Sequence, residues 1–109
     1  MTRENLLIRD GGICVWCGRE PWPTDLTAEH LLPRSRSGRT VPENLAVACR
    51  ACNRRRRSRQ VAAYVRSQRD HGYEPRMDLL QIALGRLSGS ESPVHAEYAQ
   101  RQLTLLGRL

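Results

Sequence analysis

The chain has 109 residues, the length of one small domain, and it carries a formal net charge of +7 at pH 7. Every basic residue is an arginine, which favours an anionic partner but is equally explained by GC-rich codon usage. The apolar run near the amino terminus has only three residues and no segment approaches membrane-spanning length, so we expect a cytoplasmic protein without a signal peptide or membrane span.

The first predicted element is a short helix in the segment TRENLLIRD, residues 2–10. Thr2 is a suitable N-cap, Leu6, Leu7 and Ile8 form an apolar group, and Gly11 with Gly12 would end the helix.

Four cysteines then form two CxxC pairs in the pattern C-x2-C-x31-C-x2-C: Cys14, Cys17, Cys49 and Cys52. In a reducing compartment this pattern predicts a closed, tetrahedral, structural zinc site rather than two redox dithiols. The gap of 31 residues exceeds the roughly 15–20 residues of a zinc ribbon, so a folded segment should lie between the pairs.

The segment between the cysteine pairs predicts a β-hairpin with a long connection. Residues 26–33 (LTAEHLLP) and 44–48 (NLAVA) have strand-like composition, and the polar residues between them form a loop. We expect Trp16 and Trp22 to cover the metal site rather than to stack on bases.

Residues 51–72 predict one continuous helix, because the segment contains no proline and ends at Gly72. On such a helix one side carries apolar residues and the opposite side carries arginines. The apolar side holds Val61, Tyr64 and Val65, and the opposite side holds Arg55, Arg59 and Arg66.

Residues 74–87 and 92–109 predict two further helices, each with a proline near its start. They carry no recognisable chemistry, and we expect His71 to be a helix-end cation and His95 a surface residue. An exposed apolar stripe would make these helices a surface for a protein partner. Its members would be Leu79, Leu80, Leu103 and Leu106.

Four segments occur in an order and spacing that resemble the HNH endonuclease family: CVWCG, EHLLPRSRSG, NLAVACRACN and RRRR. The resemblance covers roughly residues 1–60. It implies an α+β fold with a ββα-metal core on a structural zinc site. We expect this core over residues 1–71 and a C-terminal helical extension over residues 72–109.

The resemblance also implies the site residues of an H-N-N variant. His30 matches the catalytic histidine, Asn44 the middle asparagine, and Asn53 the last motif position. Glu29 stands where the family more often has aspartate. His30 would act as general base, and Glu29 with Asn53 would hold a catalytic Mg²⁺ or Mn²⁺ ion. For Asn44 we favour a structural role in the loop over a catalytic one.

Arginines are concentrated in the middle of the chain, where residues 34–59 hold nine arginines and one acid, Glu43. We expect Arg57 to contact a phosphate near the site. Broader contacts to a DNA duplex are expected from Arg34, Arg36, Arg55 and Arg59.

These patterns predict a metal-dependent endonuclease that cuts or nicks DNA, most simply double-stranded DNA. One alternative is a zinc-knuckle protein that binds nucleic acid without cleaving it. Another is a nuclease subunit of a larger phage or defence complex, which would use the C-terminal helices as its protein interface.

Overall fold

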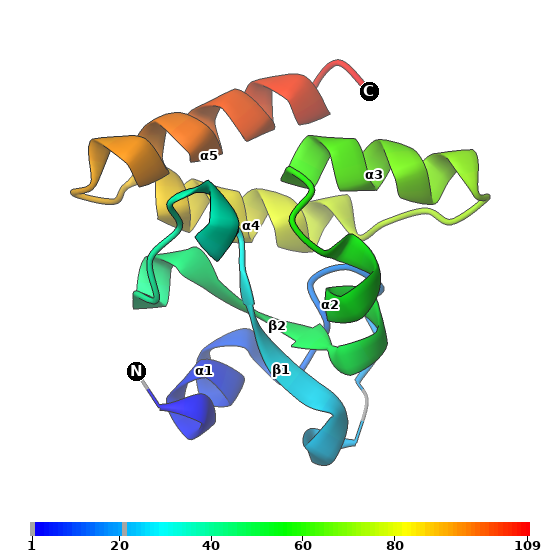
Figure 1. The fold of residues 1–109 in the computed structure, drawn as a ribbon. Helices are drawn as coiled ribbons and strands as arrows, with labels where there is room; N and C mark the ends of the chain where they lie inside the picture. Colours follow the sequence, from blue (N-terminus) through cyan, green and yellow to red (C-terminus); the bar gives the residue numbers. More distant parts are fainter. Residues whose placement is uncertain (1, 21) are drawn as a thin grey trace.

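The computed structural model describes residues 2–20 and 22–109, which form an α+β fold of five α-helices around a two-stranded antiparallel sheet (Figure 1). The helices and strands are α1 (Arg3–Asp10), β1 (Leu26–His30), β2 (Leu45–Cys49), α2 (Arg50–Arg56), α3 (Val61–Asp70), α4 (Met77–Ser88) and α5 (Pro93–Leu106). Short 3₁₀ turns occur at Pro23–Asp25, Arg34–Arg36 and Pro42–Asn44. None of the helices described is long and apolar enough to cross a membrane.

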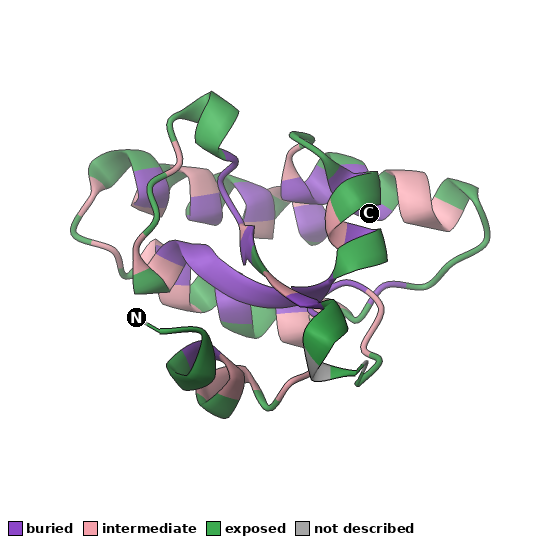
Figure 2. Cartoon of the chain, turned by 60° about the horizontal axis from the view of Figure 1, so that its bottom comes forward, coloured by how far each residue is buried: buried purple, intermediate pink, exposed green. Residues whose placement is uncertain are grey.

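The sheet is the predicted hairpin, with its first strand ending at His30 instead of Pro33. Leu26 pairs with Cys49 and His30 pairs with Leu45, so residues 31–44 form the long connection. Every residue of β2 is buried, as Figure 2 shows along the length of the strand. Leu45 and Val47 pack with Leu6 of α1, while the alternate residues of the strand join the main core.

Helix α1 confirms the helix predicted at the amino terminus. The Thr2 side chain accepts a hydrogen bond from the backbone N–H of Asn5 at 3.1 Å, which caps the start of the helix. Gly11 ends it with φ 70°, a left-handed conformation that glycine adopts without steric cost.

The single helix predicted over residues 51–72 is wrong, because the chain breaks between α2 and α3. Arg57 has φ 55° and ψ −131°, which is not helical, and Arg56 turns inward so that its Nε donates to the Arg59 carbonyl at 2.6 Å. Neither proline nor glycine marks this break in the sequence. The contacts that stabilise it come from a distant part of the chain.

Helix α5 supplies those contacts from side chains spaced along one of its faces. The Tyr98 hydroxyl accepts from the backbone N–H of Val61 at 3.1 Å, and Gln102 Oε1 accepts from that of Ala62 at 2.8 Å. These N–H groups belong to the first turn of α3 and have no partner within that helix. Side chains of α5 therefore cap α3 and make a new helix start favourable at Val61.

Helices α4 and α5 confirm the two predicted C-terminal helices and pack on the core that includes the cysteines and β2. The exposed leucine stripe is wrong, because Leu80 is fully buried, Leu106 is 4% exposed, and Leu79 and Leu103 pack against the same core. These leucines join the C-terminal helices to the rest of the chain and are not left for a partner.

Candidate active site

The two CxxC pairs meet in one cluster, as their spacing predicts. The four Sγ atoms all lie within 4.8 Å of one another, and none of the cysteines is in a disulfide. Tetrahedral zinc with Zn–S distances of about 2.3 Å places its sulfur atoms about 3.8 Å apart. The four thiols are thus positioned to bind a metal ion.

The cluster sits where β2 ends and α2 begins. Cys49 is the N-cap of α2, and its sulfur accepts from the backbone N–H of Cys52 at 3.4 Å. Within the cluster, the hydrogen bond between Cys14 and Cys52 lowers the pKa of the Cys14 thiol and raises that of Cys52, which favours a thiolate at Cys14. The metal site therefore sets the position of α2 relative to the hairpin.

The two tryptophans have different environments. Trp16 is fully buried in the core beside the cysteines, and its ring makes an edge-to-face contact with Tyr64 at 5.0 Å between centroids. Trp22 is 79% exposed and lines an open cavity together with Cys49 of the cluster, so its role as a cover of the metal site stays a prediction. The lining of this cavity also includes Arg19, Arg50 and Arg54.

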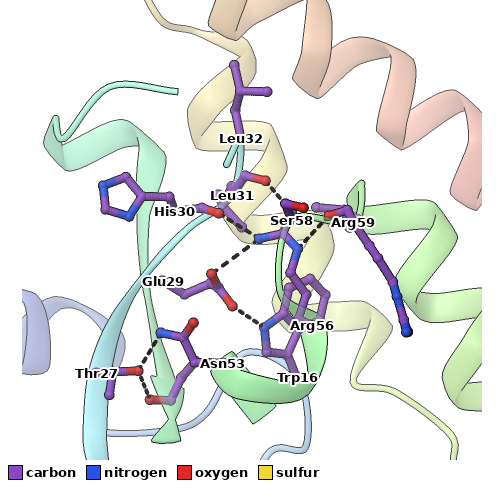
Figure 3. A network of polar contacts seen from close by, with 12 residues as sticks. Trp16, Thr27, Glu29, His30, Leu31, Leu32, Asn53, Arg56, Ser58 and Arg59 are labelled. Carbon is purple, nitrogen blue, oxygen red and sulfur yellow. Dashed lines mark hydrogen bonds and ion pairs between the residues drawn. The ribbon is translucent and has the colours of Figure 1, made fainter. Parts of the chain in front are cut away.

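Glu29 lies in a buried polar network between β1 and α2 (Figure 3). Its Oε2 accepts from Trp16 Nε1 at 3.0 Å, and its Oε1 is 3.3 Å from Arg56 Nη1. Burial raises the pKa of Glu29, and the Arg56 charge opposes that shift. Each carboxylate oxygen thus has one protein partner and retains lone-pair capacity for one more.

Arg56 is a member of this network that the sequence did not single out, because a run of four arginines usually forms a solvated helix face. It is fully buried, and its Nη1 and Nη2 each donate at 2.6 Å, to the carbonyl oxygens of His30 and Leu31. One signal was available in the sequence. Arg56 follows Cys52 by four residues, which places both on the same, inward face of a helix.

We expect Arg56→Met to lower the free energy of unfolding by about 3–5 kcal/mol, because it leaves Glu29 buried without its cation. Denaturant titration followed by circular dichroism measures the change. Arg55→Met is the matched control, since Arg55 is exposed and its loss should cost less than about 0.5 kcal/mol. Equal stability of the two variants would contradict the role of the network.

His30 is half-buried at the end of β1, and in Figure 3 its ring points away from the Glu29 network. Its Nε2 lies 2.8 Å from the Thr40 hydroxyl. Burial lowers the pKa of His30, and the positive charges of Arg34 and Arg56 lower it further. The imidazole is therefore neutral at pH 7, which is the state that can accept a proton.

Asn53 lies in α2 and reaches back to β1, where its Nδ2 donates to the Thr27 hydroxyl at 2.8 Å. Thr27 itself donates to the Ala48 carbonyl at 2.9 Å, so its hydroxyl accepts from the Asn53 amide. The Oδ1 atom of Asn53 therefore faces away from Thr27, and Figure 3 shows it pointing toward the Glu29 carboxylate. No group in the described part of the chain donates to Oδ1.

Asn44 is fully buried and joins the two ends of the long connection. Its Nδ2 donates to the Leu32 carbonyl at 3.0 Å and to the Arg39 carbonyl at 2.9 Å, and its Oδ1 accepts from the Leu32 N–H at 2.8 Å. All of its polar atoms are bonded to backbone, so the side chain holds the loop and has no atom left for chemistry.

The arginines expected to contact DNA are exposed, in two neighbouring segments: Arg34, Arg36, Arg55, Arg57 and Arg59. Arg36 Nε donates to the Ser58 carbonyl at 2.7 Å, so the long connection touches the break between α2 and α3. Gly38 permits this fold of the loop, because a Cβ there would lie 1.7 Å from the Leu32 carbonyl oxygen. Arg34, Arg55 and Arg57 donate no side-chain hydrogen bond within residues 2–20 and 22–109.

The two remaining histidines have different positions. His71 is exposed at the end of α3, where its Nδ1 lies 2.7 Å from the Ser67 carbonyl oxygen, in agreement with a helix-end residue. The prediction that His95 is a surface residue is wrong, since it is 1% exposed. Its Nε2 accepts from the backbone N–H of Arg39 at 3.1 Å.

The fold and the cysteine cluster thus define a hairpin and helix held on a metal-binding site, with His30 at the end of the first strand and Asn53 in the first turns of the helix. A family model for HNH endonucleases matches residues 14–68, which is half of the chain. The protein belongs to the HNH endonuclease family. A comparison with curated protein sequences finds no match.

Proposed function

We propose that the protein is a metal-dependent endonuclease that hydrolyses phosphodiester bonds of DNA. The observation that carries this proposal is that two side-chain atoms, Nδ1 of His30 on β1 and Oδ1 of Asn53 on α2, have no hydrogen-bond partner within residues 2–20 and 22–109. A protein that only binds nucleic acid needs neither atom.

His30 is the proposed general base. With a proton on Nε2 donated to Thr40, the lone pair on Nδ1 is available to take a proton from an attacking water. The lowered pKa keeps this lone pair free at pH 7. Because the active form is deprotonated, the acid limb of the rate profile should lie below pH 6.5, the unperturbed histidine value.

Asn53 and Glu29 would hold the catalytic ion through oxygen atoms, which are the ligands that Mg²⁺ and Mn²⁺ prefer. Oδ1 of Asn53 accepts no hydrogen bond from the residues that the structure describes, and Glu29 keeps lone pairs beside its bonds to Trp16 and Arg56. Two protein ligands suit Mg²⁺, which usually takes its other ligands from water and substrate phosphate. When bound, the ion would stabilise negative charge on the leaving oxygen.

Zinc is the proposed occupant of the four-cysteine cluster. Four cysteine sulfur atoms within 4.8 Å of one another would form a closed site with soft thiolate ligands, which selects zinc over magnesium or calcium. Such a site has no open coordination position. The proposed role of the zinc is structural. We propose a location in the reducing cytoplasm, where the thiols stay free to bind it.

The exposed arginines beside the site make a duplex the proposed substrate. Arg34 and Arg36 lie in the long connection after His30. Arg55 lies in the last turn of α2, and Arg57 and Arg59 lie in the segment between α2 and α3. Their guanidinium groups match phosphate geometry and give binding that weakens with salt.

Among these arginines, Arg57 is the strongest candidate for a direct contact with the substrate. Its φ of 55° is unusual for a residue with a Cβ, and such strain costs on the order of 1–3 kcal/mol. The side chain is exposed and makes no hydrogen bond in the described chain that would offset this cost. We assign the strained residue to a phosphate contact near the scissile bond.

We expect Arg57→Gly to raise the free energy of unfolding by about 1 kcal/mol while weakening DNA binding, because glycine relieves the strain and removes the cation. The slope of log Kd against log salt should become shallower by about 0.9. Arg57→Ala is the matched control, which should lose the same affinity without the gain in stability. Unchanged DNA affinity in both variants would refute the contact.

The experiment that tests the function uses supercoiled plasmid, the wild-type protein, and Mg²⁺ or Mn²⁺ with and without chelator. Metal-dependent appearance of nicked or linear DNA is the expected result. Retention of the plasmid in a gel-shift assay without any cleavage would instead identify the zinc-knuckle binding protein.

A further inference from the structure

Helix α5 reaches the candidate site through His95. Its Nε2 accepts from the Arg39 N–H at 3.1 Å. Because a backbone N–H can only donate, Nε2 must carry the lone pair, and the neutral ring has its hydrogen on Nδ1. Nδ1 has no partner in residues 2–20 and 22–109, so Arg39 is the polar contact that the buried ring makes there.

The peptide groups on both sides of Arg39 are hydrogen-bonded to buried side chains. Its N–H is bonded to His95, and its carbonyl accepts from Asn44 Nδ2 at 2.9 Å. His95 and Asn44 are both buried, so neither contact is exchanged readily for water. Thr40 is the next residue, and its position follows from that of the Arg39 peptide.

Thr40 is exposed and contacts His30, with 2.8 Å between its hydroxyl oxygen and Nε2. This contact fixes the orientation of the ring, whichever group donates, because a hydroxyl can both donate and accept. If Nε2–H donates to Thr40, the lone pair lies on Nδ1 and the ring cannot rotate without losing the bond. If Thr40 were not held in place, the orientation of the His30 ring, and with it the direction of Nδ1, would be undetermined.

The start of α5 fixes the position of His95 independently of the site. Pro93 is the first helical residue, and the side chain of the N-cap Ser92 accepts from the backbone N–H of His95 at 3.4 Å. His95 lies outside residues 14–68, the part matched by the family model.

We infer that His95 is a positioning residue for His30, acting through the Arg39 peptide and the Thr40 hydroxyl. The inference rests on the proposed function of His30 as general base. It makes α5 a support of the proposed nuclease site, acting through the contact of His95 with the Arg39 peptide.

The test compares four variants in the plasmid assay. His95→Phe keeps a ring without an acceptor, His95→Gln keeps an acceptor, and Thr40→Val removes the hydroxyl at constant shape. The fourth variant combines His95→Phe with Thr40→Val. If His95→Phe does not fold, His95→Met replaces it in both variants, because the flexible methionine fills irregular space without a strong acceptor.

We expect His95→Phe and Thr40→Val each to lower kcat about three- to tenfold, the range for one orienting hydrogen bond, with KM unchanged. His95→Gln should recover most of the rate. The double variant should be no slower than the slower single one, because both changes remove the same contact. Wild-type kcat in His95→Phe, or additive losses in the double variant, would overturn the inference.

A second measurement separates this inference from the proposed function. The ¹⁵N shifts of the His30 ring report its tautomer in the free protein, with or without nuclease activity. His95→Phe should move them in the same direction as Thr40→Val. If the wild type does not cleave DNA, the proposed function fails. If the ¹⁵N shifts of His30 do not move in His95→Phe, the positioning role is rejected, whether or not the wild type cleaves.

Discussion

Cys52→Ser is expected to unfold the protein rather than merely to inactivate it. Cys52 is 2% exposed, and it belongs both to the cluster and to the core that joins β2, α3 and α4. A structural zinc contributes on the order of 10–16 kcal/mol in finger peptides, against about 5–15 kcal/mol for the whole stability of a typical domain. Loss of one of the four ligands therefore weakens a contribution that is as large as the stability itself.

Circular dichroism and thermal melting test this expectation, together with the metal content of the purified protein. The wild type should carry one zinc per chain, lose its melting transition on chelation, and recover it when zinc is added back. A wild type that is free of zinc and melts unchanged in chelator would refute the structural role of the cluster.

His30→Ala is expected to abolish cleavage while leaving fold, zinc content and DNA affinity close to those of the wild type. The His30 ring contacts Thr40 at the surface and has no part in the cysteine cluster. General-base catalysis contributes about 10²–10⁴-fold, so the loss should be evident in a plasmid assay. His71→Ala is the matched control, because His71 is an exposed histidine at a helix end and should cleave normally.

Asn53→Ala provides a comparison within the same site. Its cleavage should recover in part when Mg²⁺ or Mn²⁺ is raised, since the lost group is a proposed ligand of the ion. No metal concentration should restore His30→Ala. A His30→Ala protein that cleaves at the wild-type rate would make His30 a structural residue and refute the proposed mechanism.

Local signals in the sequence were sufficient to predict several features of the structure. The spacing of Cys14, Cys17, Cys49 and Cys52 predicted the cluster, because tetrahedral ligation requires two tight pairs. Thr2 and Gly11 predicted the limits of α1, because capping depends on neighbouring residues. The structural role of Asn44 followed from its place at the end of the long connection and the start of β2.

The placement of His30 and Asn53 on a strand and a helix was also predicted, through the resemblance to the HNH family. What the resemblance could not provide was their hydrogen-bond partners. Thr40 lies ten residues from His30, and Thr27 lies 26 residues from Asn53. The atoms left free for chemistry depend on these partners, and so became evident only in three dimensions.

The sequence by itself thus determined the metal cluster, the hairpin and the helix caps, which depend on residue type and short spacing. Only the tertiary structure decided the break at Arg57 and the burial of Arg56 and His95. The physical reason is that a buried charge or a new helix start is stable only with a partner. Those partners lie far along the chain, since Glu29 neutralises Arg56 and the side chains of α5 cap the first turn of α3.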